Sequence, residues 1–538
     1  MSKIFYPDFF NDVFGPIMQP GSSSSFAGNS RVGWAASFTI KGELRQVKIS
    51  FNPGDKGQIR KLGNMMEDRA FLGGVQKFRP DDERLFRAHE LAREKNISYE
   101  FGVLDRDNGY PETVRFDLES QTGEKGELIG ISVGGGMIKV YEINHFPLLW
   151  QGDSHALLVK GRDNFALAEG LIKDLRAAVL EHSIVRNSVG EEACYIELSR
   201  PPEEKALNTF KGGDWVLIPA LLPVVSFNGR GNQLFKTVDE WIAYAKERRI
   251  SFVEAAIEYE KVFSGWDDTA IWDYFGKIRE ILLNQIHALE DRGVDLVPDT
   301  PLLPVYGKFW KRYKKESRVL EDSLTSRIID YAFSVNAKIP GVKIVPGPMG
   351  TGGGYLFSAL EAVREARGFS RRKQLEGLVI AAGLGAIAYT LCRASGVSGC
   401  VGESGICCAM ASGAITLMAG GTGQDVQNAA SMALQANIGI PCDPIPGGLE
   451  FPCLTRTVRA AVTAPLYADM ALAGINPLIP YHEMLALIER TRTIYPDALS
   501  GPDCGTNCTA TAERCQRFLA DEVMEGKLKW EAGKYLNQ

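Results

Sequence analysis

The sequence is poor in the features that mark several large classes of protein. Its 538 residues hold six histidines and a net charge of −6, so it has no basic excess that would predict binding to nucleic acid or an anionic membrane. The stretch Met1–Phe14 already contains two aspartates, unlike a secretory leader. The apolar run Leu378–Leu391 is too short to span a bilayer. We therefore expect a cytoplasmic protein without a membrane segment.

The composition is that of a globular protein with sizeable cores. Hydrophobic residues make up 45% and aromatic residues 9% of the chain. The length predicts about two to four domains. Ten cysteines without a secretory leader favour a reducing compartment, where thiols stay free.

Half of the cysteines fall in one short segment, Gly399–Cys453. Cys442 and Cys453 flank Asp-Pro and Pro-Gly-Gly turn signals, so we expect both in a loop or at helix ends. Cys400 precedes a run of small residues, Ala409–Gly421, that is typical of a tightly packed, buried helix. Three thiols from separate short segments suit a metal centre better than a disulfide framework.

Spacing alone leaves several interpretations of these thiols open. Cys407 and Cys408 are explained as well by packing inside a helix, because free cysteine is among the most buried residue types. Zinc sites usually show paired cysteines or nearby histidines, and no histidine lies between His287 and His482. An iron–sulfur cluster needs only thiolates and tolerates wide spacing. The cluster is favoured over zinc and over packing or redox thiols, and three thiolates would leave one iron open.

Two stretches of this segment resemble the α domain of bacterial iron–sulfur-dependent L-serine dehydratases. The sequence G-C-V-G-E-S-G at 399–405 is similar to the family's C-Q-G-E-V-G. The sequence C-D-P-I-P-G-G-L-E-F-P-C-L-T-R-T at 442–457 is similar to C-D-P-V-x-G-L-V-x-V-P-C-I-x-R-N, with the same step between its cysteines. The resemblance implies that Cys400, Cys442 and Cys453 hold a [4Fe–4S] cluster.

The resemblance also implies roles for residues around this centre. A cysteine of the C-terminal tail fills the fourth cluster position in part of the family, and Cys504 or Cys508 would match it here. Glu403 belongs to the C-x-G-E motif, where its carboxylate would orient the cluster loop or handle a proton.

The N-terminal serine run is by composition a flexible loop, but it too resembles a family motif. D-V-F-G-P-I followed by serines and Ala-Gly is similar to D-x-F-G-P-I-x-x-G-P-S-S-S-H-T-A-G, a substrate-pocket loop. This implies that the substrate carboxylate is bound by Ser22, Ser23 and Ser24. Ser25 and Phe26 replace the family's His-Thr, so Ser25 stands where a catalytic histidine is expected.

A glycine-rich stretch, 345–354, precedes a predicted helix. Such a helix start can present N–H groups to an anion, or it can simply allow close packing. No lysine follows, so it is not a nucleotide-binding P-loop. The family's A-P-T-N-G-x-x-G implies a substrate contact by Gly350, Thr351 and Gly352, with Met349 and Gly350 in place of Thr-Asn.

The predicted architecture is an N-terminal α/β domain, a small α/β module and a large all-helical domain. Residues 1–150 resemble the family's β domain, with strands expected at Ser37–Ile40 and Gln46–Phe51 and helices at Gln58–Leu72 and Pro80–Lys95. The family's G-H-x-T-D histidine is missing, because Met65, Met66 and Glu67 occupy that part of the motif.

The middle of the chain divides into a module and a connection. Residues 151–200 are expected to form a strand, a helix and two strands, which resembles the ligand-binding ACT module; a spacer that only joins subunits is the alternative. Such modules pair, so we expect a homodimer. Residues 201–232 are expected to be a linker with an extended segment that covers a sheet edge or helix groove. Residues 233–538 are expected to be helical and to carry the cluster loops.

The function implied is the elimination of water from L-serine to give pyruvate and ammonia, as in amino-acid catabolism and gluconeogenesis. Hydroxide is a poor leaving group that a Lewis acid assists, and the α-proton needs a base within reach. Candidate bases are Glu403, His145, His155, Lys343 and a thiolate of the tail. Because the family histidines are missing, two alternatives stay open. One is the same architecture acting on cysteine or a hydroxy acid, and the other is a non-catalytic iron–sulfur sensor.

Overall fold

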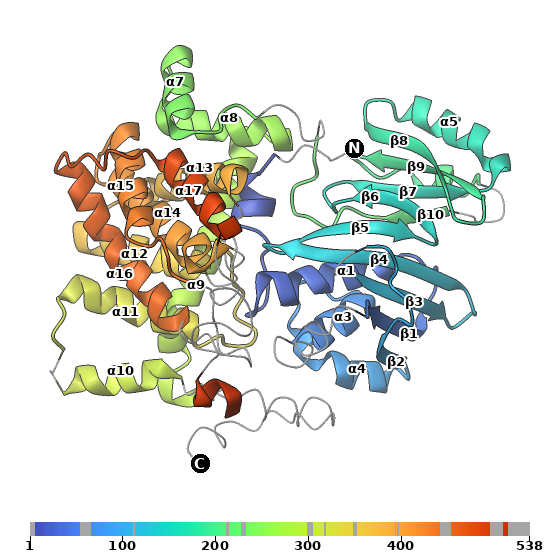
Figure 1. Ribbon diagram of the computed structural model, residues 1–538, viewed down its shortest axis with the longest axis horizontal. Helices are drawn as coiled ribbons and strands as arrows, with labels where there is room; N and C mark the ends of the chain where they lie inside the picture. Colours follow the sequence, from blue (N-terminus) through green and yellow to red (C-terminus); the bar gives the residue numbers. More distant parts are fainter. Residues whose placement is uncertain are drawn as a thin grey trace. The chain divides into compact units, whose positions relative to one another are not determined.

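The computed structural model describes residues 6–53, 66–110, 113–210, 215–227, 233–297, 305–316, 319–347, 352–392, 394, 398–441, 453–494 and 509–514. The chain forms two compact units. One is an α/β unit, Ser23–Gly231 with Phe263–Gly265, and the other is a helical unit built from the rest of the chain (Figure 1). The predicted fold class, an N-terminal α/β part followed by a large helical part, is confirmed.

The α/β unit contains a six-stranded sheet in the order β2-β1-β3-β4-β5-β6. β1 and β2 are parallel, and the other neighbours are antiparallel. The strands are β1 (Leu44–Phe51), β2 (Ser98–Val103), β3 (Val114–Ser120), β4 (Lys125–Gly134), β5 (Met137–Ile143) and β6 (Phe146–Trp150). Alternation along β3 buries Val114, Phe116 and Leu118 on one face, as expected for a sheet covered on that side.

Three helices supply side chains to the core on this face: α1 (Asn29–Ala36), α3 (Glu67–Val75) and α4 (Ala88–Glu94). Helices α1 and α3 approach closely at Gly33 and Gly74. A Cβ on Gly74 would lie 2.3 Å from the carbonyl oxygen of Ser30, so only glycine permits this contact.

A second sheet of the same unit has the order β10-β7-β9-β8, all antiparallel. Its elements are β7 (His155–Lys160), α5 (Phe165–Asp174), β8 (Val179–Arg186), β9 (Glu192–Leu198), α6 (Glu204–Leu207) and β10 (Trp215–Ile218). This is the βαββαβ topology of ferredoxin-like folds. One face packs on the core of the first sheet, and the other packs with α5.

Two predicted elements of the α/β unit differ from the structure. Residues Ser37–Ile40 were expected to form a strand but make a turn after α1, because the hydroxyls of Ser37 and Thr39 bond the carbonyls of Trp34 and Ala36. The single helix expected over Pro80–Lys95 is a 3₁₀ turn followed by α4.

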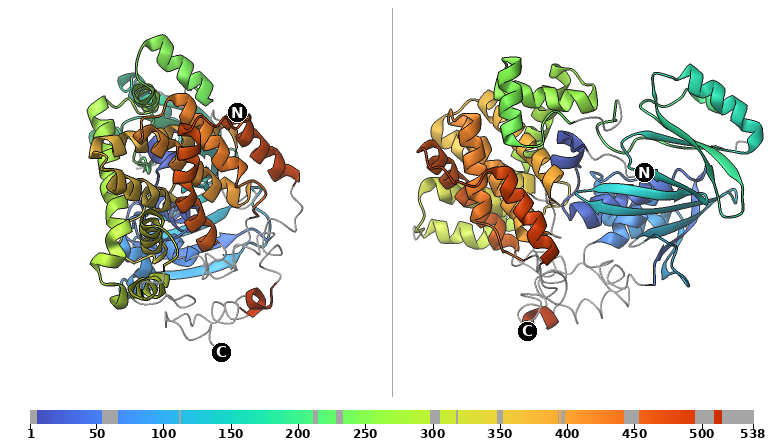
Figure 2. Two further views of the ribbon diagram at one scale, coloured as in Figure 1. Left: turned by 90° about the vertical axis from the view of Figure 1, so that its left-hand side faces the viewer. Right: turned by 45° about the horizontal axis from the view of Figure 1, so that its top comes forward.

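The helical unit is centred on the buried helix α14 (Ser404–Met418), which packs against α12, α13, α15 and α16. The orange and red helices of Figure 2 show this bundle in two directions. The helices are α7 (Val238–Arg248), α8 (Phe252–Ser264), α9 (Asp268–Asp291), α10 (Tyr306–Lys315), α11 (Ser323–Asn336), α12 (Gly352–Arg367), α13 (Arg371–Leu391), α14, α15 (Gly423–Gln435), α16 (Cys453–Leu472) and α17 (Tyr481–Ile494). Small residues along α14 allow these close approaches.

Two segments of this bundle, Arg371–Leu391 and Cys400–Met418, are long and apolar enough to cross a membrane by length and composition. Their apolar windows are 72% and 89% buried inside the fold, as in core helices.

The N-terminal segment up to Ser22 belongs to the helical unit, although it precedes the α/β unit in sequence. The Tyr6 hydroxyl donates to the carbonyl of Tyr259, and the Phe9 N–H donates to the Glu260 carboxylate at 2.7 Å. Met18 and Ile344 exchange two backbone hydrogen bonds. The finer predicted boundaries, at 150, 200 and 232, stay predictions.

Candidate metal centre

Cys400 lies in a short 3₁₀ turn, Cys400–Gly402, directly before α14. Its side chain is buried, and its Sγ lies 2.9 Å from the Ser404 hydroxyl. Burial raises the pKa of the Cys400 thiol, and the Glu403 carboxylate adds to this, whereas Ser404 and the guanidinium groups of Arg456 and Arg459 lower it. A cation or a metal would therefore favour the thiolate here.

The backbone N–H of Cys400 is hydrogen-bonded to the segment that leads to Cys442. The Cys400 N–H donates to the carbonyl of Ile440 at 2.9 Å. Ile440 precedes Cys442 by two residues, so the hydrogen bond joins the neighbourhoods of two predicted ligands.

The third predicted ligand, Cys453, is the first residue of α16. One turn later, Arg456 Nη1 donates to the carbonyl of Pro441 at 2.7 Å. Arg459 Nη2 donates to Asn437 Oδ1, while the Asn437 amide bonds the carbonyl of Ala433. Both arginines therefore fix the start of α16 to residues 437–441.

These contacts bring together the described neighbours of all three predicted ligands. Cys442 itself lies outside the described residues, as do Gly350, Thr351, Cys504 and Cys508. The donor set fits an iron–sulfur cluster in two respects. The cysteines come from separate segments that converge, and two guanidinium groups offset the negative charge of thiolates.

Cys407 and Cys408 lie on α14 and are buried, as the packing interpretation predicts. The Cys407 thiol donates to the carbonyl of Gly352 at 3.1 Å, and burial raises its pKa. This contact places Gly352, the described part of the predicted substrate loop, against the helix that begins beside Cys400.

Glu403 joins the 3₁₀ turn to α14, and its carbonyl accepts from the Cys407 N–H. Its negative charge acts on a second buried group, the hydroxyl of Tyr389 on α13. Burial raises the Tyr389 pKa first, and the carboxylates of Asp12 and Glu403 raise it further. The Tyr389 hydroxyl is enclosed and has no hydrogen-bond partner among the described residues. The Tyr389 hydroxyl therefore stays protonated, close enough to two carboxylates to feel their charge.

The serine run crosses the division between the two units. Ser22 belongs to the helical unit, and Ser23, Ser24 and Ser25 belong to the α/β unit. The latter three start a π-helical turn, Ser23–Gly28, that continues into α1, and the Asn29 amide donates to the Ser25 carbonyl. A helix start of this kind presents backbone N–H groups.

The residues missed by sequence reasoning are the polar partners of these motifs. Arg456, Arg459 and Asn437 hold the cysteine segments together. Arg456 is part of the motif at 442–457, but the motif gave it no role, and Arg459 and Asn437 lie outside it. In the α/β unit, His89 Nε2 lies 2.6 Å from Asp68 Oδ2, and its Nδ1 lies 2.9 Å from the Tyr99 hydroxyl. Asp68 lies at the end of the motif in which the family histidine is missing. His89 comes from α4, so its imidazole reaches this motif on α3 from a neighbouring helix.

Two other histidines named as candidate bases, His155 and His145, have local partners. The Nδ1 of His155 accepts from the Ala220 N–H, and burial lowers its pKa. His145 lies beside Glu127 in the β5–β6 turn.

Comparison with known proteins supports the interpretation of the motifs. Residues 240–505 match a family model described as the serine dehydratase alpha chain. The L-serine dehydratase alpha chain of Peptoniphilus asaccharolyticus is 26% identical over 299 residues, which is 54% of this chain and 100% of the relative. A probable L-serine dehydratase alpha chain of Latilactobacillus sakei is 33% identical over 153 residues, 28% of this chain and 73% of the relative.

A second kind of relative matches as well. A probable L-serine dehydratase beta chain of Bacillus subtilis (strain 168) is 35% identical over 160 residues, 30% of this chain and 71% of the relative. The chain belongs to the L-serine dehydratase family. It is therefore an enzyme of the lyase class, with regions related to the alpha and beta chains fused in one polypeptide.

The glycine-rich start of α12 gives a prediction about stability. In Gly353→Ala, the new Cβ would lie 2.3 Å from the carbonyl oxygen of Val345. Because backbone must shift, we expect unfolding free energy to fall by about 1–3 kcal/mol in a denaturant titration.

The matched control is Gly276→Ala in α9, where the nearest atom is a guanidinium nitrogen of Arg371 at 4.0 Å. This variant should gain about 0.5–1 kcal/mol from helix propensity. Equal effects of the two variants would contradict the packing argument.

Proposed function

We propose that the chain deaminates L-serine to pyruvate and ammonia, with a [4Fe–4S] cluster held by Cys400, Cys442 and Cys453. The observation that carries this proposal is the pair of hydrogen bonds from Cys400 and Arg456 to residues 440 and 441, which draw the three cysteine segments together. The names of the relatives give the substrate.

The chain's own residues have distinct tasks in this proposal. The bound cluster would supply the Lewis acid that assists departure of the serine hydroxyl group. Ser22, Ser23 and Ser24, with Gly350, Thr351 and Gly352, hold the substrate carboxylate through hydroxyls and backbone N–H groups. Cys504 or Cys508 would supply a fourth ligand to the cluster.

Proton transfer is assigned to residues next to these groups. Glu403 follows Cys400 by three residues, and its charge raises the pKa of both the Cys400 thiol and the Tyr389 hydroxyl. This nearness supports the proposal that Glu403 holds or accepts a proton. Ser25 occupies the position of the missing histidine. Loss of the α-proton and of hydroxide leaves aminoacrylate, which hydrolyses to pyruvate and ammonia.

We further propose that the enzyme is cytoplasmic and homodimeric, and that residues 151–218 form an ACT-like module. The ferredoxin-like order of β7, α5, β8, β9, α6 and β10 supports the last point. The elements after 200, expected to be a linker, complete this module.

Anaerobic reconstitution with iron and sulfide, followed by assays for pyruvate and ammonia, tests the proposal. L-Serine should be the best substrate among L-serine, L-cysteine and L-threonine. A preference for another substrate would support the same architecture with a changed pocket. A cluster-loaded protein that acts on none of them would overturn the catalytic proposal and favour a sensor.

A further inference from the structure

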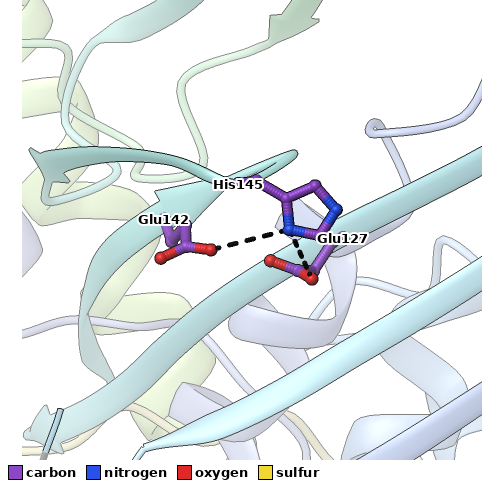
Figure 3. A group of neighbouring side chains, drawn as sticks. All are labelled: Glu127, Glu142 and His145. Carbon is purple, nitrogen blue, oxygen red and sulfur yellow. Dashed lines mark ion pairs between the residues drawn. The ribbon is translucent and has the colours of Figure 1, made fainter. Parts of the chain in front are cut away.

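The turn between β5 and β6 brings together two carboxylates and an imidazole that have no role in the proposed reaction. Glu127 lies on β4, Glu142 on β5, and His145 in the turn, and their ligand atoms all lie within 4.8 Å of one another (Figure 3). The His145 Nδ1 is 3.0 Å from Glu127 Oε2 and 3.9 Å from Glu142 Oε1. Bonds of about 2.0–2.1 Å to a zinc ion place its ligand atoms roughly 3–4 Å apart, so little movement is needed.

The carboxylate of Glu127 is the unusual member, because its side chain is only 4% exposed. Its Oε1 has no hydrogen-bond donor among the described residues. The Glu127 and Glu142 carboxylates point toward one another in Figure 3. Ionised carboxylates have no donor, so these two can hydrogen-bond to each other only by sharing a proton. Burial first, and then the hydrogen bond and charge of Glu142, raise the pKa of Glu127 to about 8, although Arg115 opposes this rise.

Negative charge exceeds positive charge around Glu127. Asp117 is directly opposite Glu127 in the β3–β4 ladder, which is unfavourable for like charges. Arg115 Nη2 lies 2.6 Å from Glu127 Oε2, but the same guanidinium also binds Asp117. Among the described residues, three carboxylates therefore lie around one guanidinium, so carboxylates outnumber the cation beside them even when Glu127 and Glu142 share a proton.

The backbone holds the imidazole over this charge. Asn144 and His145 form the two-residue turn, both with positive φ, 48° and 68°. The Glu127 N–H donates to Asn144 Oδ1 at 2.8 Å, and the Asn144 N–H donates to the Glu127 carbonyl at 2.9 Å. The His145 side chain is 62% exposed, so an ion from solvent can reach the group.

We propose that Glu127, Glu142 and His145 form a binding site for a divalent transition-metal cation such as Zn²⁺. Carboxylate oxygen and imidazole nitrogen are ligands of such ions, and water completes the coordination. The bound ion cancels the excess charge and fastens the β5–β6 turn to β4. This site is independent of the cysteine centre and of the proposed function.

A second group of similar composition does not have uncompensated carboxylates. His287, Glu361 and Glu365 also lie close together. There, Glu361 accepts hydrogen bonds from Arg364 and Gln374, and Glu365 accepts one from the Tyr331 hydroxyl. Its carboxylates are already compensated by these donors.

Calorimetric titration of the cluster-loaded, full-length protein with Zn²⁺ under anaerobic conditions tests the site. We expect one binding event that weakens by more than about tenfold in both His145→Gly and Glu127→Gln, because even an outer-shell partner of a metal is worth that much. Glycine suits the positive φ of residue 145, and glutamine keeps the shape of Glu127, so both variants should fold. Melting curves without metal check this.

The matched control is His482→Asn in the helical unit, where His482 faces a single carboxylate, Asp239, at 3.4 Å. It should leave the isotherm unchanged. Titration with Co²⁺ distinguishes the site from cysteine ligands, because the expected spectrum lacks thiolate charge-transfer bands. Identical Zn²⁺ isotherms for the wild type, His145→Gly and Glu127→Gln would overturn the proposal and leave Glu127 and Glu142 as a proton-sharing pair.

Discussion

Cys400→Ser is expected to remove the iron–sulfur chromophore and to lower the rate of L-serine deamination by on the order of 10³-fold or more. The thiolate is the proposed ligand, and loss of Lewis-acid assistance costs several kcal/mol of transition-state stabilisation. Iron and sulfide content, the visible absorption spectrum and pyruvate formation measure the effect. Because Cys400 Sγ already lies beside a hydroxyl, serine should be accommodated without unfolding.

The control for this prediction is Cys408→Ser on α14, the helix that follows Cys400. Cys408 is buried, and its Sγ lies 3.7 Å from the Thr463 hydroxyl, so a serine hydroxyl finds a partner there. This variant should keep its iron and most of its activity. If Cys400→Ser retained as much iron as Cys408→Ser, Cys400 would not be a ligand.

Arg456→Met is expected to weaken cluster retention by about 10–100-fold, the usual cost of losing an outer-shell partner of a metal site. The substitution removes both the hydrogen bond to the Pro441 carbonyl and a positive charge that lowers the Cys400 pKa. Iron release to a chelator, followed over time, gives the comparison, and Arg456→Lys should restore part of the loss.

Arg492→Met on α17 serves as its control, because among the described residues Arg492 pairs with Glu489 of the same helix. Ion pairs within one helix, near the surface, contribute little. Iron release at the same rate from both variants would show that Arg456 does not support the centre.

The main architecture could be predicted because the helical unit has strong local patterns. Residues 233–538 were expected to be helical, and the described part of this range forms α7 to α17, with the small-residue run in the buried α14. The start of α16 was harder to locate, because turn signals precede Cys453 and Pro465 lies inside the helix. The prediction that Cys453 stands at a helix end still agrees with its place at the start of α16.

The parts that escaped prediction depend on contacts between distant residues. The hydrogen bond from Arg456 to Pro441 and the pair of His89 with Asp68 have no spacing that a sequence reveals. Similarly, β10 pairs with β7 although more than 50 residues separate them, so the sequence predicted an extended segment there but did not reveal its partner strand. Tertiary pairing, and not local propensity, decides such elements.

The residues before Ser23 and those from Asn232 onward, except Phe263–Gly265, belong to the helical unit, so the α/β unit is inserted into its sequence. A proteolytic cut between the second sheet and α7 would leave two fragments that stay associated. Tyr6, Phe9 and Met18 of the first fragment are hydrogen-bonded to residues of the second. After such a cut, the N-terminal segment would therefore keep the two fragments associated in a one-to-one ratio.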